Sequence, residues 1–111
     1  MRHWAEEVAR RHLEARGFEA LAANAVVRGG ELDLVMRDGR TVVAVEVRQR
    51  AHDRFGSAAE SLRPAKLRRL RRALARWAAA ELAGPAPLRV DAVLIDGPRG
   101  ACRIEHLRDV A

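Results

Sequence analysis

Residues 29–50 read GGELDLVMRDGRTVVAVEVRQR, and this stretch decides the fold because it predicts two strands joined by a tight turn. Apolar and polar residues alternate on both sides of Asp38 and Gly39, a dipeptide that favours the positive backbone angles of a two-residue hairpin loop. With these two residues as the loop, Leu34 faces Val43 on a face that is apolar except for one threonine. The segment therefore predicts a hairpin with one buried face, which also carries Leu32.

The opposite face of this hairpin carries charged side chains. It holds Glu31, Asp33, Glu46 and Arg48, because side chains alternate between the two faces along a strand. In the predicted register Asp33 faces Ala44 and lies diagonally across from Glu46. Diagonal neighbours on adjacent strands are about 7 to 8 Å apart, so the two carboxylates are within reach of a shared cation.

Two converging carboxylates repel each other unless positive charge lies between them. Oxygen ligands favour Mg²⁺ or Mn²⁺, and either Glu6 or Glu7 could add a ligand from an N-terminal helix. Such an ion polarises a phosphodiester and lowers the pKa of a bound water, and Arg48 is placed to orient that water. The alternative is an exposed sheet face with ordinary surface ion pairs, which contribute little stability.

The rest of the chain predicts an alternation of helices and strands. Apolar residues at helical spacing predict helices over residues 3–16 and from Pro64 to about Leu82. Strands are predicted over residues 18–27, 31–37, 40–50 and 88–96, with a final edge strand at 101–107. The order is helix, three strands, helix, and one or two strands, which predicts an α/β fold with a mixed central sheet and flanking helices. The 111 residues suit a single domain, residues 1–111.

The composition narrows the partners and the compartment. The net charge is +6, and all but one of the 21 basic residues are arginine, which favours a polyanionic partner such as nucleic acid. Cys102 is the single cysteine, which suits a reducing compartment. Neither a signal peptide nor a stretch of transmembrane length is recognisable, so we expect a cytoplasmic protein without a membrane partner.

Four segments carry a family resemblance in the same order: AEEVARRHLEARGFEAL (5–21), GGELDLV (29–35), VVAVEVRQR (42–50) and FGSAAESLRPAKLRRL (55–70). They resemble the YraN-like family of bacterial proteins, which are thought to be endonucleases related to archaeal Holliday junction resolvases. The similarity covers nearly the whole chain. It implies a restriction-endonuclease-like fold of the PD-(D/E)xK superfamily, whose core has the order α-β-β-β-α-β predicted above.

The resemblance also implies roles for individual residues. Asp33 matches the first metal-binding aspartate, Glu46 the second carboxylate, and Arg48 the position that usually holds lysine. Glu6 matches a glutamate of the first helix, and Lys66 matches a lysine at the start of the second helix. The implied catalytic set is Asp33, Glu46, Arg48 and Glu6, with the metal ion held by Asp33 and Glu46.

Arginine at position 48 is the departure that bears most on activity. Lysine can lose a proton and activate water, whereas a guanidinium group is effectively always protonated. Lys66 is the only lysine in the chain, and we hypothesise that it reaches the metal site and supplies the missing function. The alternative is that Lys66 is a solvated residue on a basic helix.

The expected function is that of a Mg²⁺- or Mn²⁺-dependent endonuclease that acts on DNA, including branched DNA. Phosphate contacts are expected from Arg50, Arg54, Lys66, Arg69 and Arg72. The resemblance suggests a homodimer, because junction resolvases make two symmetric incisions. The alternative function is a catalytically impaired protein of the same fold that binds nucleic acid or a protein partner without hydrolysis.

Overall fold

The structure of the chain is a computed structural model, and it describes residues 4–50 and 62–111. The helices and strands follow each other in the predicted order, and the final edge strand is present. In chain order they are α1 (Trp4–Glu14), β1 (Glu19–Val27), β2 (Gly30–Asp38), β3 (Thr41–Arg50), α2 (Pro64–Glu81), β4 (Leu88–Asp96) and β5 (Arg103–Leu107).

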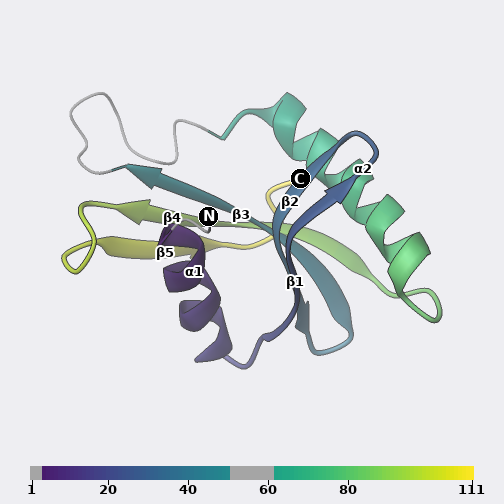
Figure 1. The fold of residues 1–111 in the computed structure, drawn as a ribbon, viewed down its shortest axis with the longest axis horizontal. Coiled ribbons are helices and arrows are strands. Elements are labelled where there is room, and N and C mark those ends of the chain that lie inside the picture. The colour runs from purple at the N-terminus through teal and green to yellow at the C-terminus, as the bar shows by residue number, and fades with distance from the viewer. Residues whose placement is uncertain (1–3, 51–61) are drawn as a thin grey trace.

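The strands form one mixed sheet with the spatial order β1-β2-β3-β4-β5 (Figure 1). Neighbouring strands are antiparallel except for β3 and β4, which are parallel. A parallel pair needs a long crossover connection, and α2 lies in the connection between these two strands. The mixed sheet with flanking helices is therefore confirmed.

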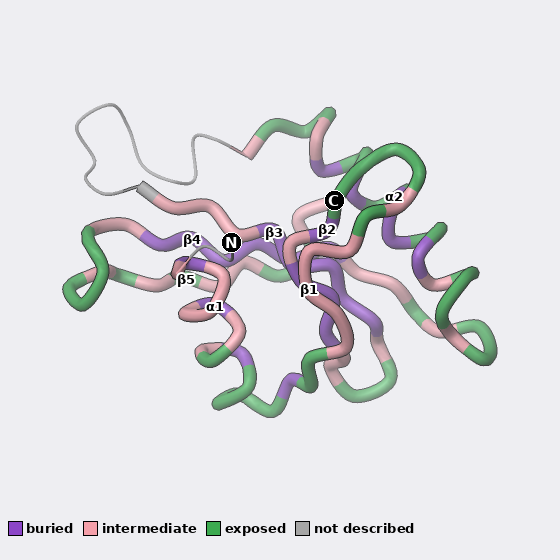
Figure 2. Tube along the Cα trace, viewed as in Figure 1, coloured by how far each residue is buried: buried purple, intermediate pink, exposed green. Residues whose placement is uncertain are grey.

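Each face of the sheet is covered by one helix. Buried side chains of α1 pack against one face, and those of α2 pack against the other. The central strands β3 and β4 are accordingly the most buried part of the sheet (Figure 2). The α1 side is built from Ala5, Ala9, Leu13, Phe18, Leu34, Met36, Val43, Val45, Val93 and Ile95. The α2 side is built from Leu32, Val35, Val42, Ala44, Leu67, Leu70, Ala73, Leu74, Trp77 and Val90.

The β2–β3 hairpin has a different register from the predicted one. Leu34 pairs with Val45 and not with Val43. Asp38 remains in the strand, and the loop begins at Gly39, whose φ of +62° suits glycine. Each β2 residue therefore pairs with a β3 residue two positions later than predicted. Because side chains alternate, a shift of two positions keeps the paired residues on the same face.

Long-range ion pairs explain why Asp38 stays in the strand. Its Oδ2 accepts hydrogen bonds from Arg89 at 2.9 Å and from Arg108 at 3.2 Å. These partners lie on β4 and just after β5, far along the chain from the turn. Local turn preferences alone therefore could not set the loop.

The corrected register also removes Asp33 from its predicted position opposite Ala44. Val35, and not Asp33, lies opposite Ala44. One further step along this register would place Asp33 directly opposite Glu46. Residues directly opposite each other are about 4.5 to 5.5 Å apart, against about 7 to 8 Å on the diagonal.

The pairing of β2 with β3 stops just before Asp33. The recorded ladder ends with Leu34 opposite Val45, and the Asp33 side chain then accepts a hydrogen bond from the Val47 backbone N–H at 3.0 Å. Beyond this point Leu32 packs on the α2 side of the sheet, while Leu34 packs on the α1 side. The prediction that both leucines share one face is therefore wrong, because β2 departs from β3 here.

Candidate functional site

The site is formed by two carboxyl groups where β2 departs from β3. Asp33 on β2 is half-buried, and Glu46 on β3 is only 3% exposed. The carboxyl groups of both residues line the same pocket. The structure thus brings together the two predicted metal ligands.

Two basic side chains contact the same oxygen of Glu46. Arg48 Nη2 lies 2.7 Å from Glu46 Oε2, and Lys66 Nζ lies 3.1 Å from it. Arg48 comes from β3, two residues further along, whereas Lys66 reaches across from the first turn of α2. Lys66 is therefore not a solvated residue remote from the acids, and its side chain lies beside Glu46 as the hypothesis requires.

These contacts do not use all the hydrogen-bond donors of the Arg48 guanidinium group. Its Nε atom is buried and has no hydrogen-bond partner among the residues that the structure describes. A buried donor without a partner is unfavourable, and its presence is typical of functional sites that bind a further group.

The environment of Glu46 shifts its titration. Burial raises the pKa of Glu46 to about 7, and the negative charge of the neighbouring Asp33 acts in the same direction. Arg48 and Lys66 oppose the rise without cancelling it. The pair of acids therefore holds a proton near neutral pH, in a place where an additional cation would be favourable.

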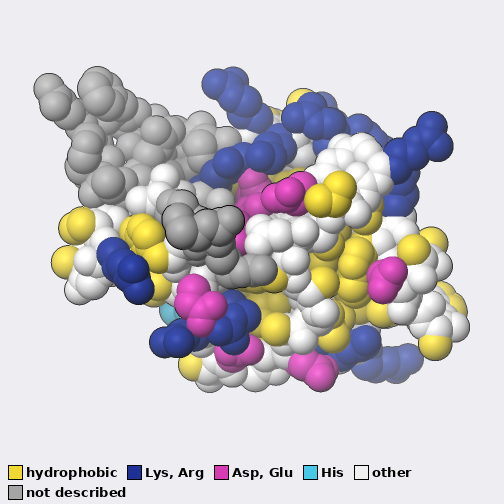
Figure 3. Space-filling view, in the orientation of Figure 1, with side chains coloured by type: hydrophobic (Ala, Val, Ile, Leu, Met, Phe, Trp, Pro, Cys, Tyr) yellow, Lys and Arg dark blue, Asp and Glu magenta, His cyan; other side chains and the backbone are white. Residues whose placement is uncertain are grey.

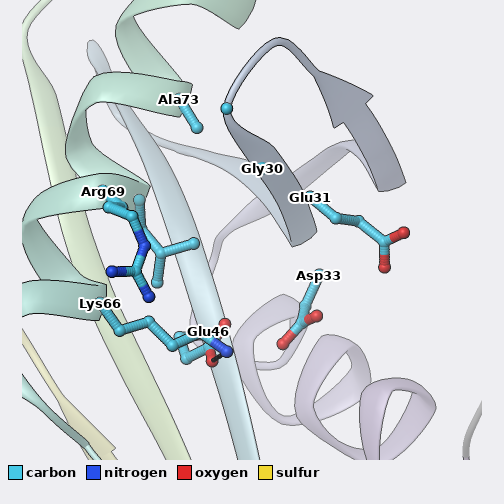
Figure 4. A pocket seen from close by; sticks show the side chains of 9 residues that line it. Gly30, Glu31, Asp33, Glu46, Lys66, Arg69 and Ala73 are labelled. Atoms are coloured by element: carbon cyan, nitrogen blue, oxygen red, sulfur yellow. Dashed lines mark ion pairs between the residues drawn. The ribbon is translucent and has the colours of Figure 1, made fainter.

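A pocket of about 300 Å³ opens above the acid pair (Figure 4). Asp33, Glu46 and Lys66 point toward one another at its floor, while Arg69 lies on the α2 side. The complete lining is Gly29, Gly30, Glu31, Asp33, Glu46, Lys66, Arg69, Leu70 and Ala73. The pocket thus lies between the β1–β2 turn and α2.

The β1–β2 turn is fixed against α2. Arg76 Nη1 donates a hydrogen bond to the carbonyl of Arg28 at 2.8 Å. Gly29 has a φ of +94°, and a Cβ atom there would lie 2.6 Å from the same Arg76 nitrogen. The backbone angle favours glycine at this position, and a side chain there would also displace the end of Arg76.

The other predicted ligand, Glu6, has a different partner. Its Oε1 accepts a hydrogen bond from Asn24 Nδ2 at 3.0 Å, which ties α1 to β1. Within residues 4–50 and 62–111, no three His, Cys, Asp or Glu side chains gather in a way that could hold a metal ion. The structure therefore does not bring Glu6 together with Asp33 and Glu46.

The predicted phosphate-binding residues fall into three groups. Lys66 and Arg69 line the pocket, and Arg72 is exposed on α2 beside a second hollow. Arg50 ends β3, but its side chain lies outside the described residues, as does the whole of Arg54.

Asp91 is the charged residue to which the sequence assigned no role. It is fully buried on β4 and accepts hydrogen bonds from Arg89, the His106 ring and the Asp109 backbone N–H. Burial opposes ionisation of Asp91, but these hydrogen bonds outweigh it and lower its pKa. The network joins β4 to β5 and to the C-terminal residues, and its buried position indicates a role in stability.

The fold and the site together define a class of protein. It is a small mixed α/β domain in which two acidic and two basic side chains meet in a pocket between a strand hairpin and a helix. Among the described residues, no helix combines the length and the apolar character needed to cross a membrane.

The chain belongs to the uncharacterised protein family UPF0102, whose sequence model matches residues 5–95. A UPF0102 protein of Frankia alni is 50% identical over 104 residues, which is 93% of this chain and 87% of the relative. A second, from Alkalilimnicola ehrlichii, is 50% identical over 95 residues, covering 85% and 75% of the two chains. A third, from Yersinia pseudotuberculosis, is 51% identical over 94 residues, covering 83% and 80%.

Proposed function

We propose that this protein is a metal-dependent endonuclease that acts on DNA, with branched or junction DNA as its preferred substrate. The observation that carries the proposal is the convergence of the Asp33 and Glu46 side chains in one pocket that Lys66 and Arg69 also line (Figure 4). Acidic groups that bind a cation, next to basic groups that bind phosphate, are the combination that phosphodiester hydrolysis requires. The resemblance to the junction resolvases supports the choice of DNA.

The two carboxyl groups fit Mg²⁺ or Mn²⁺. Mg²⁺ is usually held by one or two carboxylates, and water and substrate phosphate complete its coordination. Asp33 and Glu46 would supply these two ligands. Burial and the charge of Asp33 raise the pKa of Glu46 to about 7, and a cation beside the pair would favour the ionised form that binds it. When bound, the ion would polarise the phosphodiester and increase the acidity of a water molecule.

The basic residues have separable tasks in this proposal. Lys66 can exchange a proton with water, because an ammonium group loses its proton far more readily than a guanidinium group does. Its position 3.1 Å from Glu46 supports a role as the general base or as the group that orients water. Arg48 remains charged and stabilises negative charge on the phosphate, for which its buried Nε offers a further donor.

A binding protein without hydrolytic activity is the second candidate, and Arg48 is the residue that favours it. Both Arg48 and Lys66 already pair with Glu46, so the basic groups could replace the cation permanently. In that case the protein would bind DNA or a protein partner through its basic surface and would cleave nothing.

The experiment that separates the two candidates is a cleavage assay. The protein is incubated with end-labelled four-way junction, flap, single-stranded and duplex DNA, each with Mg²⁺, Mn²⁺ or chelator. We expect metal-dependent cleavage that is lost in Asp33→Ala and retained in Glu105→Gln, a matched loss of one exposed carboxylate on β5. Absence of cleavage under every condition, with binding retained in Asp33→Ala, would refute the enzyme and favour the binding protein.

Two further parts of the proposal concern the setting of the activity. We place the protein in the cytoplasm, because its single cysteine suits a reducing compartment. We also propose a homodimer, because two symmetric incisions in a junction need two sites. Analytical ultracentrifugation tests the dimer, and a single species of monomer mass at micromolar concentration would refute it.

A further inference from the structure

The outer surface of α2 is strongly basic. The exposed arginines of this helix are Arg68, Arg69, Arg71, Arg72 and Arg76. Glu81 at the end of the helix is its only acidic residue. Figure 3 shows Lys and Arg side chains along the upper part of the molecule, where α2 lies, next to acidic side chains.

These arginines occupy two flanks of the helix. Arg69 lines the acidic pocket together with Lys66. Arg68, Arg71 and Arg72 line a separate hollow of about 400 Å³ with Ala75. At about 100° per residue around an α-helix, Arg68 and Arg71 lie about 100° and 160° from Arg69 and therefore face a different side. Arg72 lies about 60° from Arg69, between the two flanks.

We infer that α2 binds duplex DNA by contacting the phosphates of both strands, one strand on each flank. This inference rests on the proposed function, because the flank with Arg69 presents its strand to the acid pair. An α-helix with its side chains is about 10 to 12 Å across, and the major groove of DNA is about 12 Å wide. Arginines on both flanks can therefore reach phosphates on both edges of the groove, whereas a single strand can follow only one flank.

The aromatic residues support duplex binding over single-strand binding. Proteins that bind single strands usually stack bases on exposed aromatic side chains. Here Phe18 is 4% exposed and Trp77 is 9% exposed, while Trp4 packs against the α1 side of the core. Phe55, the remaining aromatic residue, lies outside the described residues. The described surface thus offers charge for the phosphates and little aromatic surface for base stacking, which favours the duplex over the single strand.

The test is a binding titration over a range of salt concentrations. Arg68→Gln/Arg71→Gln removes two charges from the flank remote from the acids. Both residues are exposed, as is the hydrogen bond from Arg71 to the Ala111 carbonyl, so we expect the variant to fold. Arg40→Gln/Arg99→Gln removes the same charge from the β2–β3 and β4–β5 turns and is the matched control. Each full-length protein is titrated with a labelled duplex and with a single strand of equal length, in chelator, so that cleavage does not interfere.

We expect the α2 variant to lose duplex affinity and to bind the single strand as the wild type does. Each phosphate contact contributes about 0.9 to the slope of log K against log salt on duplex DNA, so two lost contacts reduce the slope by about 1.8. The duplex affinity of the wild type should then fall about 12-fold more than that of the variant between 50 and 200 mM salt. The control should match the wild type on both ligands.

Three results would overturn the inference: an unchanged duplex slope, an equal loss on duplex and single strand, or an equal loss in the control. These results can be told apart from failure of the proposed function, because cleavage that depends on Asp33 is measured separately. If the salt titration supports binding through both flanks of α2 but no cleavage depends on Asp33, the endonuclease proposal would be refuted and the inference of duplex binding would be retained.

Discussion

Glu46→Gln should change how the stability of the protein depends on pH. Glu46 is almost fully buried beside Asp33, and its pKa is about 7 in the folded chain against an ordinary value of 4.5. A group with a raised pKa stabilises the fold below its unfolded pKa, and this contribution is lost as pH rises through the folded pKa. The relevant window therefore runs from pH 4.5 to about 7. Glutamine stays neutral throughout, so the variant does not lose stability in this window.

The magnitude follows from the two pKa values. A difference between 4.5 and about 7 corresponds to roughly 3 kcal/mol, at about 1.4 kcal/mol for each pH unit. The pKa of about 7 already includes the favourable effects of Arg48 and Lys66. We therefore expect the free energy of unfolding of the wild type to fall by about 2 to 3 kcal/mol relative to Glu46→Gln between pH 5 and pH 8.

Urea-induced unfolding in chelator, followed by tryptophan fluorescence or circular dichroism, measures this difference. Glu105→Gln is the control, since Glu105 is exposed on β5 and its substitution should leave the pH dependence unchanged. If wild type and Glu46→Gln change in parallel from pH 5 to pH 8, Glu46 is ionised without penalty and the description of the acid pair is wrong.

Three further predictions concern other parts of the structure. Asp91→Asn should destabilise the fold by about 1 to 3 kcal/mol, because the amide cannot accept all the buried hydrogen bonds that the carboxylate accepts; a loss under about 0.5 kcal/mol in urea would contradict this. Gly29→Ala should lower the free energy of unfolding by at least about 1 to 2 kcal/mol, because its φ of +94° strains a residue with a side chain. Gly84→Ala is the control, since no atom lies within 4 Å of the added Cβ, and equal effects of the two substitutions would show that Gly29 is not strained by alanine. In the cleavage assay, Lys66→Ala should reduce the rate by about 100-fold or more, whereas Arg48→Lys should retain activity. A larger loss of rate in Arg48→Lys than in Lys66→Ala would assign the proton transfer to position 48.

Much of the fold could be predicted because periodicity and turn residues are local signals. The alternation around Asp38 and Gly39 indicated the hairpin, and Leu88–Asp96 was recognised as a strand from its own pattern. The register was missed because it depends on Arg89 and Arg108, which hold Asp38 in β2 from distant parts of the chain. No local preference encodes such contacts.

The candidate site, like the fold, could be predicted where local signals determine it and not where distant contacts do. Parity along the strands predicted Asp33 and Glu46 on one face, and the two residues do line one pocket although β2 no longer pairs with β3 at Asp33. The position of Lys66 depends on how α2 packs across the sheet, so its contact with Glu46 could only be hypothesised from the sequence. The partner of Glu6 was missed for the same reason, because Asn24 reaches it from a neighbouring element.

The central claim is that Asp33 and Glu46 together bind a divalent cation. The most direct measurement is a crystal structure of the protein soaked in Mn²⁺, in which anomalous scattering identifies the ion. We expect an anomalous peak within about 2.0 to 2.3 Å of oxygen atoms from both carboxylates. We also expect Lys66 or Arg48 to be displaced from Glu46 Oε2. A map with no peak between the carboxylates, and with both basic groups still paired to Glu46, would contradict it.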